Sequence, residues 1–131
     1  MTNVFTYGSL MYPEVFGPVT LASPRCHRTR LDGWSRHAIR GRSYPGAVPA
    51  IGASIEGVLW MELDEDAMQR LDQFEGDEYA RERVLVTLPG GERVDAQIYR
   101  WLDTASLLPC DWSSEAFEQH HLSDFFRIHG A

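Results

Sequence analysis

The chain has 131 residues, the size of one ordinary folding unit, and 44% of them are hydrophobic, which is enough to build a buried core. We therefore expect a single domain over residues 1–131. Nineteen acidic and twelve basic side chains give a formal net charge of −7. Such a charge repels phosphate backbones and anionic lipid headgroups, so we expect neither nucleic acid nor a membrane as partner.

The two cysteines, Cys26 and Cys110, lie far apart and have no C-x-x-C or metal-ligand spacing, which predicts reduced thiols. The N-terminus lacks a basic segment followed by an uninterrupted apolar run, and no stretch has the length and apolarity needed to cross a bilayer. We therefore expect a cytoplasmic, soluble protein.

The first predicted strand covers residues 4–7, a β-branched and aromatic run that ends at a glycine, Gly8. Backbone N–H groups are exposed at such a turn. A short helix is expected within residues 11–24, beginning near Pro13, because proline is tolerated in the first turn of a helix.

Two further strands are predicted over residues 34–40 and 55–63. The segment between them, residues 41–49, is rich in Pro and Gly, which predicts a loop.

The hydrophobic period becomes that of a helix over residues 64–75. Acidic residues occupy the first turn of this segment and Gly76 follows its last turn, as is typical of helix ends. The residues of its apolar face are Leu63, Ala67, Met68, Leu71 and Phe74.

Residues 79–88 and 92–101 flank a Pro-Gly-Gly turn with alternating apolar positions, which predicts a β-hairpin. A last helix is expected over about residues 113–128, capped by Ser113 or Ser114. Several strands with short turns, and no regular β-α-β alternation, predict an α+β fold with a mostly antiparallel, barrel-like sheet.

Glu75 is anomalous because it lies four positions after Leu71, on the face that points into the core, whereas Asp72 belongs to the solvated face. Apolar surroundings and the negative end of the helix dipole should both raise the pKa of this carboxyl. A carboxyl of this kind can take up a proton and return it. The alternative is a structural ion pair with Arg81 or Arg83, and spacing does not decide between the two.

The turn Tyr7-Gly8-Ser9-Leu10 is a second candidate feature. Successive N–H groups at such a turn can converge on a carboxylate or an oxyanion without any charged side chain. The alternative is an ordinary turn, because aromatic-Gly-Ser turns are common.

Four segments can be compared together: Val4-Phe5-Thr6-Tyr7-Gly8-Ser9-Leu10, Tyr44-Pro45, Ile55-Glu56-Gly57-Val58-Leu59-Trp60, and Leu71-Asp72-Gln73-Phe74-Glu75-Gly76-Asp77-Glu78-Tyr79-Ala80-Arg81. In their order and spacing, over about residues 4–101, the chain resembles the γ-glutamylcyclotransferase-like superfamily, and within it the AIG2-like and γ-glutamylamine cyclotransferase branch. The resemblance implies a small antiparallel β-barrel with flanking helices.

The resemblance also implies a site and a reaction. Glu75 would be the catalytic residue, and the substrate would bind to Tyr7, Gly8, Ser9, Leu10, Tyr44, Pro45 and Tyr79. Glu75 would deprotonate the α-ammonium group of a γ-glutamyl compound, and the freed amine would attack the γ-carbonyl. The products would be 5-oxoproline and an amine or amino acid, and no metal or organic cofactor would be needed.

One departure from the superfamily concerns the substrate. Its glutathione-degrading and larger branches usually carry an asparagine after Tyr-Gly-Ser, whereas this chain has Leu10 followed by Met11. The amine part of the substrate therefore stays open. Two functions also remain: the cyclotransferase, and a binding or regulatory module of the same fold that holds an amino-acid-like ligand without turnover. Tyr79 and Arg81 either orient Glu75 or the substrate, or cover the sheet edge.

Two other chemistries are weaker. His120, His121, His129 and Asp124 are possible metal ligands, but they lack a second ligand cluster and an H-E-x-x-H pattern, so we expect no metal site. Ser9 lacks the G-x-S-x-G context of an acyl nucleophile.

Overall fold

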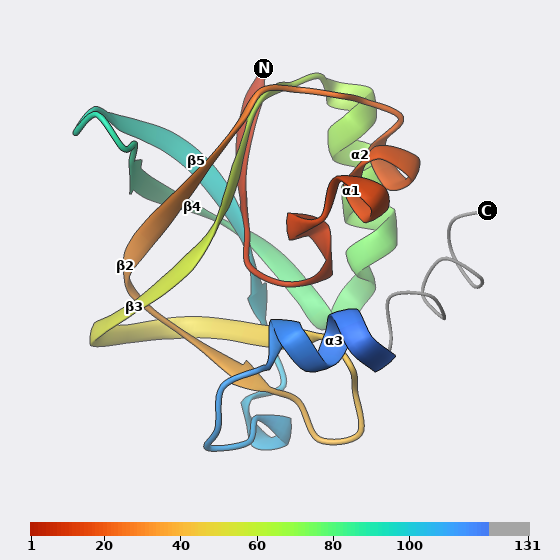
Figure 1. Ribbon diagram of the computed structural model, residues 1–131, viewed down its shortest axis with the longest axis vertical. Helices are drawn as coiled ribbons and strands as arrows, with labels where there is room; N and C mark the ends of the chain where they lie inside the picture. Colours follow the sequence, from red (N-terminus) through yellow and green to blue (C-terminus); the bar gives the residue numbers. More distant parts are fainter. Residues whose placement is uncertain (121–131) are drawn as a thin grey trace.

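Five strands close into a barrel in the order β1-β3-β2-β4-β5 in the computed structural model, which describes residues 1–120 (Figure 1). The strands are β1 (Thr2–Thr6), β2 (Cys26–Ala38), β3 (Pro45–Leu63), β4 (Tyr79–Thr87) and β5 (Arg93–Trp101). Neighbouring strands are antiparallel except β1 and β5, which close the barrel in parallel. The predicted α+β fold with a mostly antiparallel barrel is confirmed.

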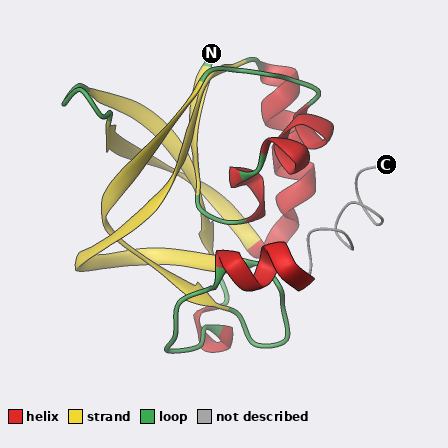
Figure 2. Ribbon diagram, viewed as in Figure 1, coloured by secondary structure: helices red, strands yellow, loops and turns green. Residues whose placement is uncertain are grey.

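The helices pack around this barrel, with α1 and α2 together on one side of it (Figure 2). They are α1 (Pro13–Thr20), α2 (Glu65–Glu75), α3 (Ser114–His120) and the short 3-10 helices η1 (Ser9–Met11), η2 (Gly76–Glu78) and η3 (Thr104–Ser106). Helix α1 begins at Pro13 as predicted. None of the helices described within residues 1–120 is long and apolar enough to span a bilayer.

Helix α2 has the ends that its sequence predicts. The side chain of Asp64 accepts a hydrogen bond from the backbone N–H of Ala67 at 2.9 Å, which caps the first turn. Gly76 ends the helix with φ +72°, in the left-handed region that favours glycine. The apolar face packs toward the barrel, where Met68 and Leu71 are buried.

Apolar side chains form two buried clusters. One lies between the helices and the barrel, where Phe16 of α1 stacks on Trp60 of β3 with 4.0 Å between ring centroids. The other fills the barrel and includes Phe5, Leu59 and Ile98, each at most 1% exposed. The first cluster fixes α2 against the barrel, and the end of α2 lines the pocket described below.

The prediction of a loop over residues 41–49 is wrong for its second half. Pro45 begins β3 and pairs with Ala38, while Pro49 pairs with Trp34. Proline is tolerated at the first residue of a strand, because no ladder donor is needed there. Strand β2 also begins at Cys26, eight residues before the predicted start, and it ends at Ala38.

The predicted hairpin is present as β4 and β5. The last helix begins at Ser114, as predicted, and is described as far as His120. The predicted continuation to residue 128, together with His121, Asp124 and His129, lies outside the described residues.

Candidate active site

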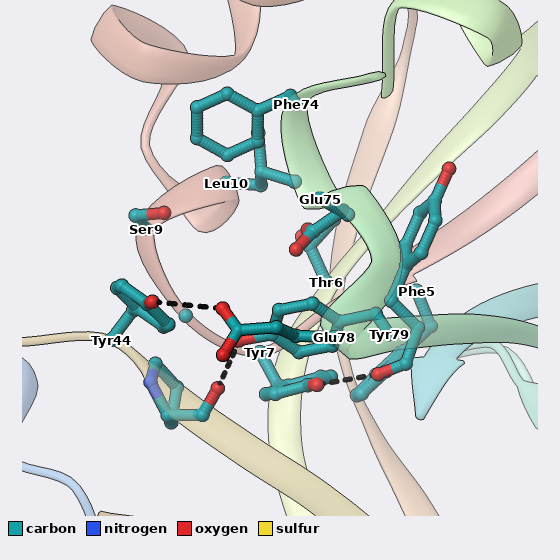
Figure 3. A pocket seen from close by; sticks show the side chains of 13 residues that line it. Phe5, Thr6, Tyr7, Ser9, Leu10, Tyr44, Phe74, Glu75, Glu78 and Tyr79 are labelled. Atoms are coloured by element: carbon teal, nitrogen blue, oxygen red, sulfur yellow. Dashed lines mark hydrogen bonds between the residues drawn. The ribbon is translucent and has the colours of Figure 1, made fainter. Parts of the chain in front are cut away.

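A pocket of about 270 Å³ opens between the β1–η1 turn, the start of β3 and the end of α2 (Figure 3). All of the predicted site residues line it: Tyr7, Gly8, Ser9, Leu10, Tyr44, Pro45, Glu75 and Tyr79. Five further residues line the pocket and were not predicted as site residues: Phe5, Thr6, Phe74, Glu78 and Tyr99. The structure therefore brings the predicted residues together, while their catalytic and binding roles stay predictions.

Glu75 is the last residue of α2, and its carboxyl points into the pocket toward the turn that carries Ser9 (Figure 3). Burial is the larger cause that raises the pKa of Glu75 to about 8, and the negative charge of Asp72 adds to it. The expected direction of this pKa shift agrees with the structure.

The alternative interpretation, a structural ion pair between Glu75 and a following arginine, is wrong. Arg81 pairs with Asp72 at 3.0 Å and Arg83 pairs with Asp95 at 2.9 Å. Within residues 1–120, no hydrogen bond or ion pair engages the Glu75 carboxyl. The predicted solvated position of Asp72 agrees with the structure, because 42% of its side chain is exposed, although its Oδ1 atom also contacts Arg81 of β4 and Tyr99 of β5.

Four tyrosines line the pocket, and the hydroxyls of three of them already donate to backbone or carboxylate acceptors. Tyr7 donates to the Tyr99 carbonyl at 2.5 Å, Tyr79 donates to the Pro45 carbonyl at 2.8 Å, and Tyr99 donates to Asp72 Oδ1 at 2.7 Å. Burial is the largest cause that raises the pKa of all three hydroxyls, which keeps them protonated. They therefore shape the pocket and do not compete with Glu75 as proton carriers.

The turn opposite Glu75 is tightly packed. A side chain at Gly8 would place its Cβ only 2.7 Å from Cδ of Pro45, so the close approach of β3 requires glycine here. The N–H groups of Ser9 and Leu10 are the first two of helix η1, and such groups have no partner within the helix. Neither N–H group has a hydrogen-bond partner among residues 1–120.

Arg36 supports this turn from outside the pocket, a contact that no local sequence pattern predicts. Its guanidinium donates to the Tyr7 carbonyl at 3.0 Å and forms two bonds with Asp111, at 2.8 and 3.1 Å. The same group lies 5.4 Å from the ring centroid of Trp112. The backbone after β1 is thereby joined to the segment before α3.

Glu78 lies at the pocket mouth, and its charge is compensated. Two nitrogens of Arg42 reach its two carboxylate oxygens at 2.9 and 3.0 Å, and the Tyr44 hydroxyl lies 3.4 Å from one of them. Arg42 also donates to the Tyr44 hydroxyl. Among the ionisable side chains that line the pocket within residues 1–120, Glu75 alone therefore has no hydrogen-bond or ion-pair partner.

The described part of the chain holds no group of three or more His, Cys, Asp or Glu residues with the geometry of a metal site. The candidate catalytic group of the pocket is the Glu75 carboxyl, which points toward the turn that carries Ser9 (Figure 3).

Comparison with known proteins identifies relatives over nearly the whole chain. The profile of the family described as "Gamma-glutamyl cyclotransferase, AIG2-like" matches residues 4–115, beyond residue 101, where the resemblance noted above ended. The chain is 32% identical over 132 residues to AIG2-like protein D of Arabidopsis thaliana, a match that covers 98% of this chain and 86% of that protein.

Solved structures share the fold. The solution structure of At5g39720.1 from Arabidopsis thaliana has a TM-score of 0.74 and 29% identity, and the match covers 96% of this chain and 86% of that one. A structure named gamma-glutamyl cyclotransferase has a TM-score of 0.68 and 18% identity, and the match covers 77% of this chain and 66% of that one. At that identity the second likeness shows a common fold.

Proposed function

The chain belongs to the gamma-glutamyl cyclotransferase, AIG2-like family, and we propose that it is a cyclotransferase-type enzyme acting on a small γ-glutamyl compound. The reaction would release an amine or amino acid and leave the glutamyl part as 5-oxoproline. One observation carries this proposal: Glu75 is a carboxyl with a raised pKa and no partner within residues 1–120, in a pocket whose other ionisable side chains are engaged.

In the first step Glu75 acts as a base toward the α-ammonium group of the substrate. A pKa of about 8 lies close to that of an α-amino group, so the proton can pass in either direction without a large free-energy difference. The free amine then attacks the γ-carbonyl carbon of the same molecule, and a new C–N bond closes a five-membered ring. Because both reacting groups belong to one molecule, the pocket accelerates attack by holding them in one conformation.

The oxyanion that forms on the γ-carbonyl, or the α-carboxylate, needs hydrogen-bond donors. The tyrosine hydroxyls are engaged with acceptors of the protein, so backbone N–H groups at Gly8, Ser9 and Leu10 are the donors that we assign. Donors fixed in advance need no reorganisation when the charge develops.

In the second step the bond to the leaving nitrogen breaks. The ring nitrogen enters as an ammonium group and loses two protons before it is a lactam N–H, and the leaving nitrogen gains two protons when it departs as an ammonium ion. Glu75 can carry these protons in turn and return to its starting state. The reaction changes no oxidation state and uses no external nucleophile.

The proposal is tested by incubating the protein with a panel of γ-glutamyl amines and γ-glutamyl peptides and measuring 5-oxoproline. Glu75→Gln, which keeps the shape of the side chain, should lower kcat by about 10²- to 10⁴-fold, the usual contribution of a general acid/base. Glu65→Gln is the matched control, because Glu65 is an exposed glutamate at the other end of α2. If folded wild-type protein forms 5-oxoproline from no member of the panel, the proposal is rejected.

The same panel separates an enzyme from a binding module. Thermal stabilisation by a γ-glutamyl compound, without product from either the wild type or Glu75→Gln, would indicate a protein that binds its ligand without turnover. Turnover by the wild type, with ligand binding retained and turnover lost in Glu75→Gln, would support the enzyme.

A further inference from the structure

Asp72 connects α2 with two strands of the barrel. It lies on α2, one helical turn before Glu75. Its Oδ1 atom accepts a hydrogen bond from the Tyr99 hydroxyl of β5 at 2.7 Å and pairs with Nε of Arg81 of β4 at 3.0 Å. One carboxylate oxygen therefore binds the last turn of α2 to two neighbouring strands.

The β4–β5 register explains why these two donors reach the same oxygen. Arg81 and Tyr99 are directly opposite each other in the antiparallel pair, so their side chains lie on the same face of the sheet. Tyr99 continues the connection, because its carbonyl accepts the hydroxyl of Tyr7 at 2.5 Å. The turn after β1, which carries Tyr7, is thus linked through Tyr99 to Asp72, one turn from Glu75.

The charges around Glu75 differ in how they are compensated. Tyr7, Tyr79 and Tyr99 are neutral and donate to protein acceptors. Glu78 is paired with Arg42 in a two-bond contact. The remaining groups are Asp72 and Arg81 themselves, together with the neutral hydroxyl of Tyr44. Of the carboxylates close to Glu75, Asp72 is the one whose position is fixed by two donors from the barrel.

We propose that Asp72 is a positioning residue of this site: held by Tyr99 and Arg81, it fixes the last turn of α2 and presents a constant negative charge to Glu75. This inference rests on the proposed function, in which Glu75 carries the proton. The negative charge of Asp72 is, after burial, the second cause that raises the pKa of Glu75. Removing that charge should therefore make Glu75 a stronger acid even if the fold is unchanged.

Asp72→Asn tests this directly, because the amide keeps an oxygen that accepts from Tyr99 and Arg81 but carries no charge. The readout is the titration midpoint of the Glu75 carboxyl, followed by its ¹³C NMR signal and assigned by the loss of that signal in Glu75→Gln. We expect the midpoint to fall by about one pH unit. The acidic limb of the kcat/KM profile should move in the same direction by the same amount.

Arg81→Gln provides the opposite perturbation and a second test if Asp72→Asn does not fold. This change removes the cation beside Asp72 and leaves the bond from Tyr99, so the Glu75 midpoint should rise by a few tenths of a pH unit, roughly. A purely structural role would not give shifts of opposite sign in the two variants. Asp95→Asn is the matched control, because Asp95 pairs with Arg83 on the same hairpin but does not line the pocket.

The outcomes separate the two proposals. An unchanged Glu75 midpoint in Asp72→Asn, or an equal fall in Asp95→Asn, overturns the role of Asp72 whether or not the wild type is active. A fall confined to Asp72→Asn, together with no 5-oxoproline from the wild type, supports the charge coupling and rejects the proposed function. A fall in both the NMR midpoint and the acidic limb supports both.

Discussion

Glu75→Gln should stabilise the protein by an amount that increases with pH. The folded state raises the pKa of Glu75 to about 8, whereas the ordinary value of the group is 4.5. Between these values the folded protein retains a proton that the unfolded chain has released. The free energy of unfolding of the wild type therefore falls as pH rises through this interval, and the penalty is complete above about pH 8.

The magnitude follows from the size of the interval. Each pKa unit corresponds to about 1.36 kcal/mol, so a shift of about 3.5 units sets an upper value of about 4.8 kcal/mol. The Glu75 side chain keeps partial contact with solvent at the pocket, and solvent screening reduces that value. We expect a gain of about 2–4 kcal/mol above pH 8, because glutamine fills the same space without ionising.

The assay is urea unfolding of the wild type and Glu75→Gln at several pH values between 4.5 and 9. The difference in unfolding free energy should be small at the acidic end and should approach its full value at the basic end. The exposed control Glu65→Gln should give a difference that does not follow this curve. A stability difference for Glu75→Gln that is constant or decreases with pH would refute the assignment of a raised pKa to Glu75.

Three further predictions concern activity and the pocket wall. In steady-state assays, the acidic limb of the pH profile of kcat/KM should lie near pH 8, because Glu75 must be ionised to accept a proton. A limb near pH 4.5 would contradict this prediction. Gly8→Ala should lower the free energy of unfolding, measured in urea, by about 1–3 kcal/mol and raise KM, because the new Cβ would lie 2.7 Å from Cδ of Pro45. An unchanged KM would contradict a role of this contact in shaping the pocket. Arg36→Met should raise KM more than it lowers kcat in the same assays, because it removes the hydrogen bond to the Tyr7 carbonyl. A loss of kcat alone would contradict the role of Arg36 in supporting the turn after β1.

The elements that were predicted from sequence are those specified by local chemistry. Helix α2 has an N-cap at Asp64, a glycine at its end and a continuous apolar face, and all three signals fall within a few turns. The β4–β5 hairpin is likewise specified by a turn and two alternating segments. Elements were predicted correctly where the sequence pattern that specifies them lies within the element itself or its turn.

The elements that were missed depend on distant partners. Pro45 and Pro49 give a loop signal, yet both belong to β3 because β2 supplies the pairing. The first half of β2 is rich in charged residues, and its strand conformation follows from pairing with β3 along its length. Barrel closure pairs Val4 of β1 with Gln97 of β5. These residues are far apart in the sequence, so no local pattern predicts their pairing.

The residues of the candidate site also divide into those with a local sequence signal and those that depend on distant partners. Glu75 was recognisable because a carboxylate on an apolar helix face is a local anomaly. Arg36 was not, because its contact with the pocket turn is a hydrogen bond to the carbonyl of Tyr7, 29 residues away. Glu78 lines the pocket and was missed, since a glutamate in an exposed acidic run carries no sequence signal of its own.

Asp72 and Glu75 differ in their hydrogen-bond and ion-pair partners, and this difference arises from the barrel and not from the helix that carries both. They are one turn apart on α2, and helix periodicity places one toward solvent and the other toward the core but does not determine the hydrogen-bond partners of either. In the structure Asp72 receives both donors, from Tyr99 and Arg81, and Glu75 receives none within residues 1–120. Because the register of β4 and β5 brings Arg81 and Tyr99 to Asp72, a change at Arg81, which does not line the pocket, should alter the proton affinity of Glu75.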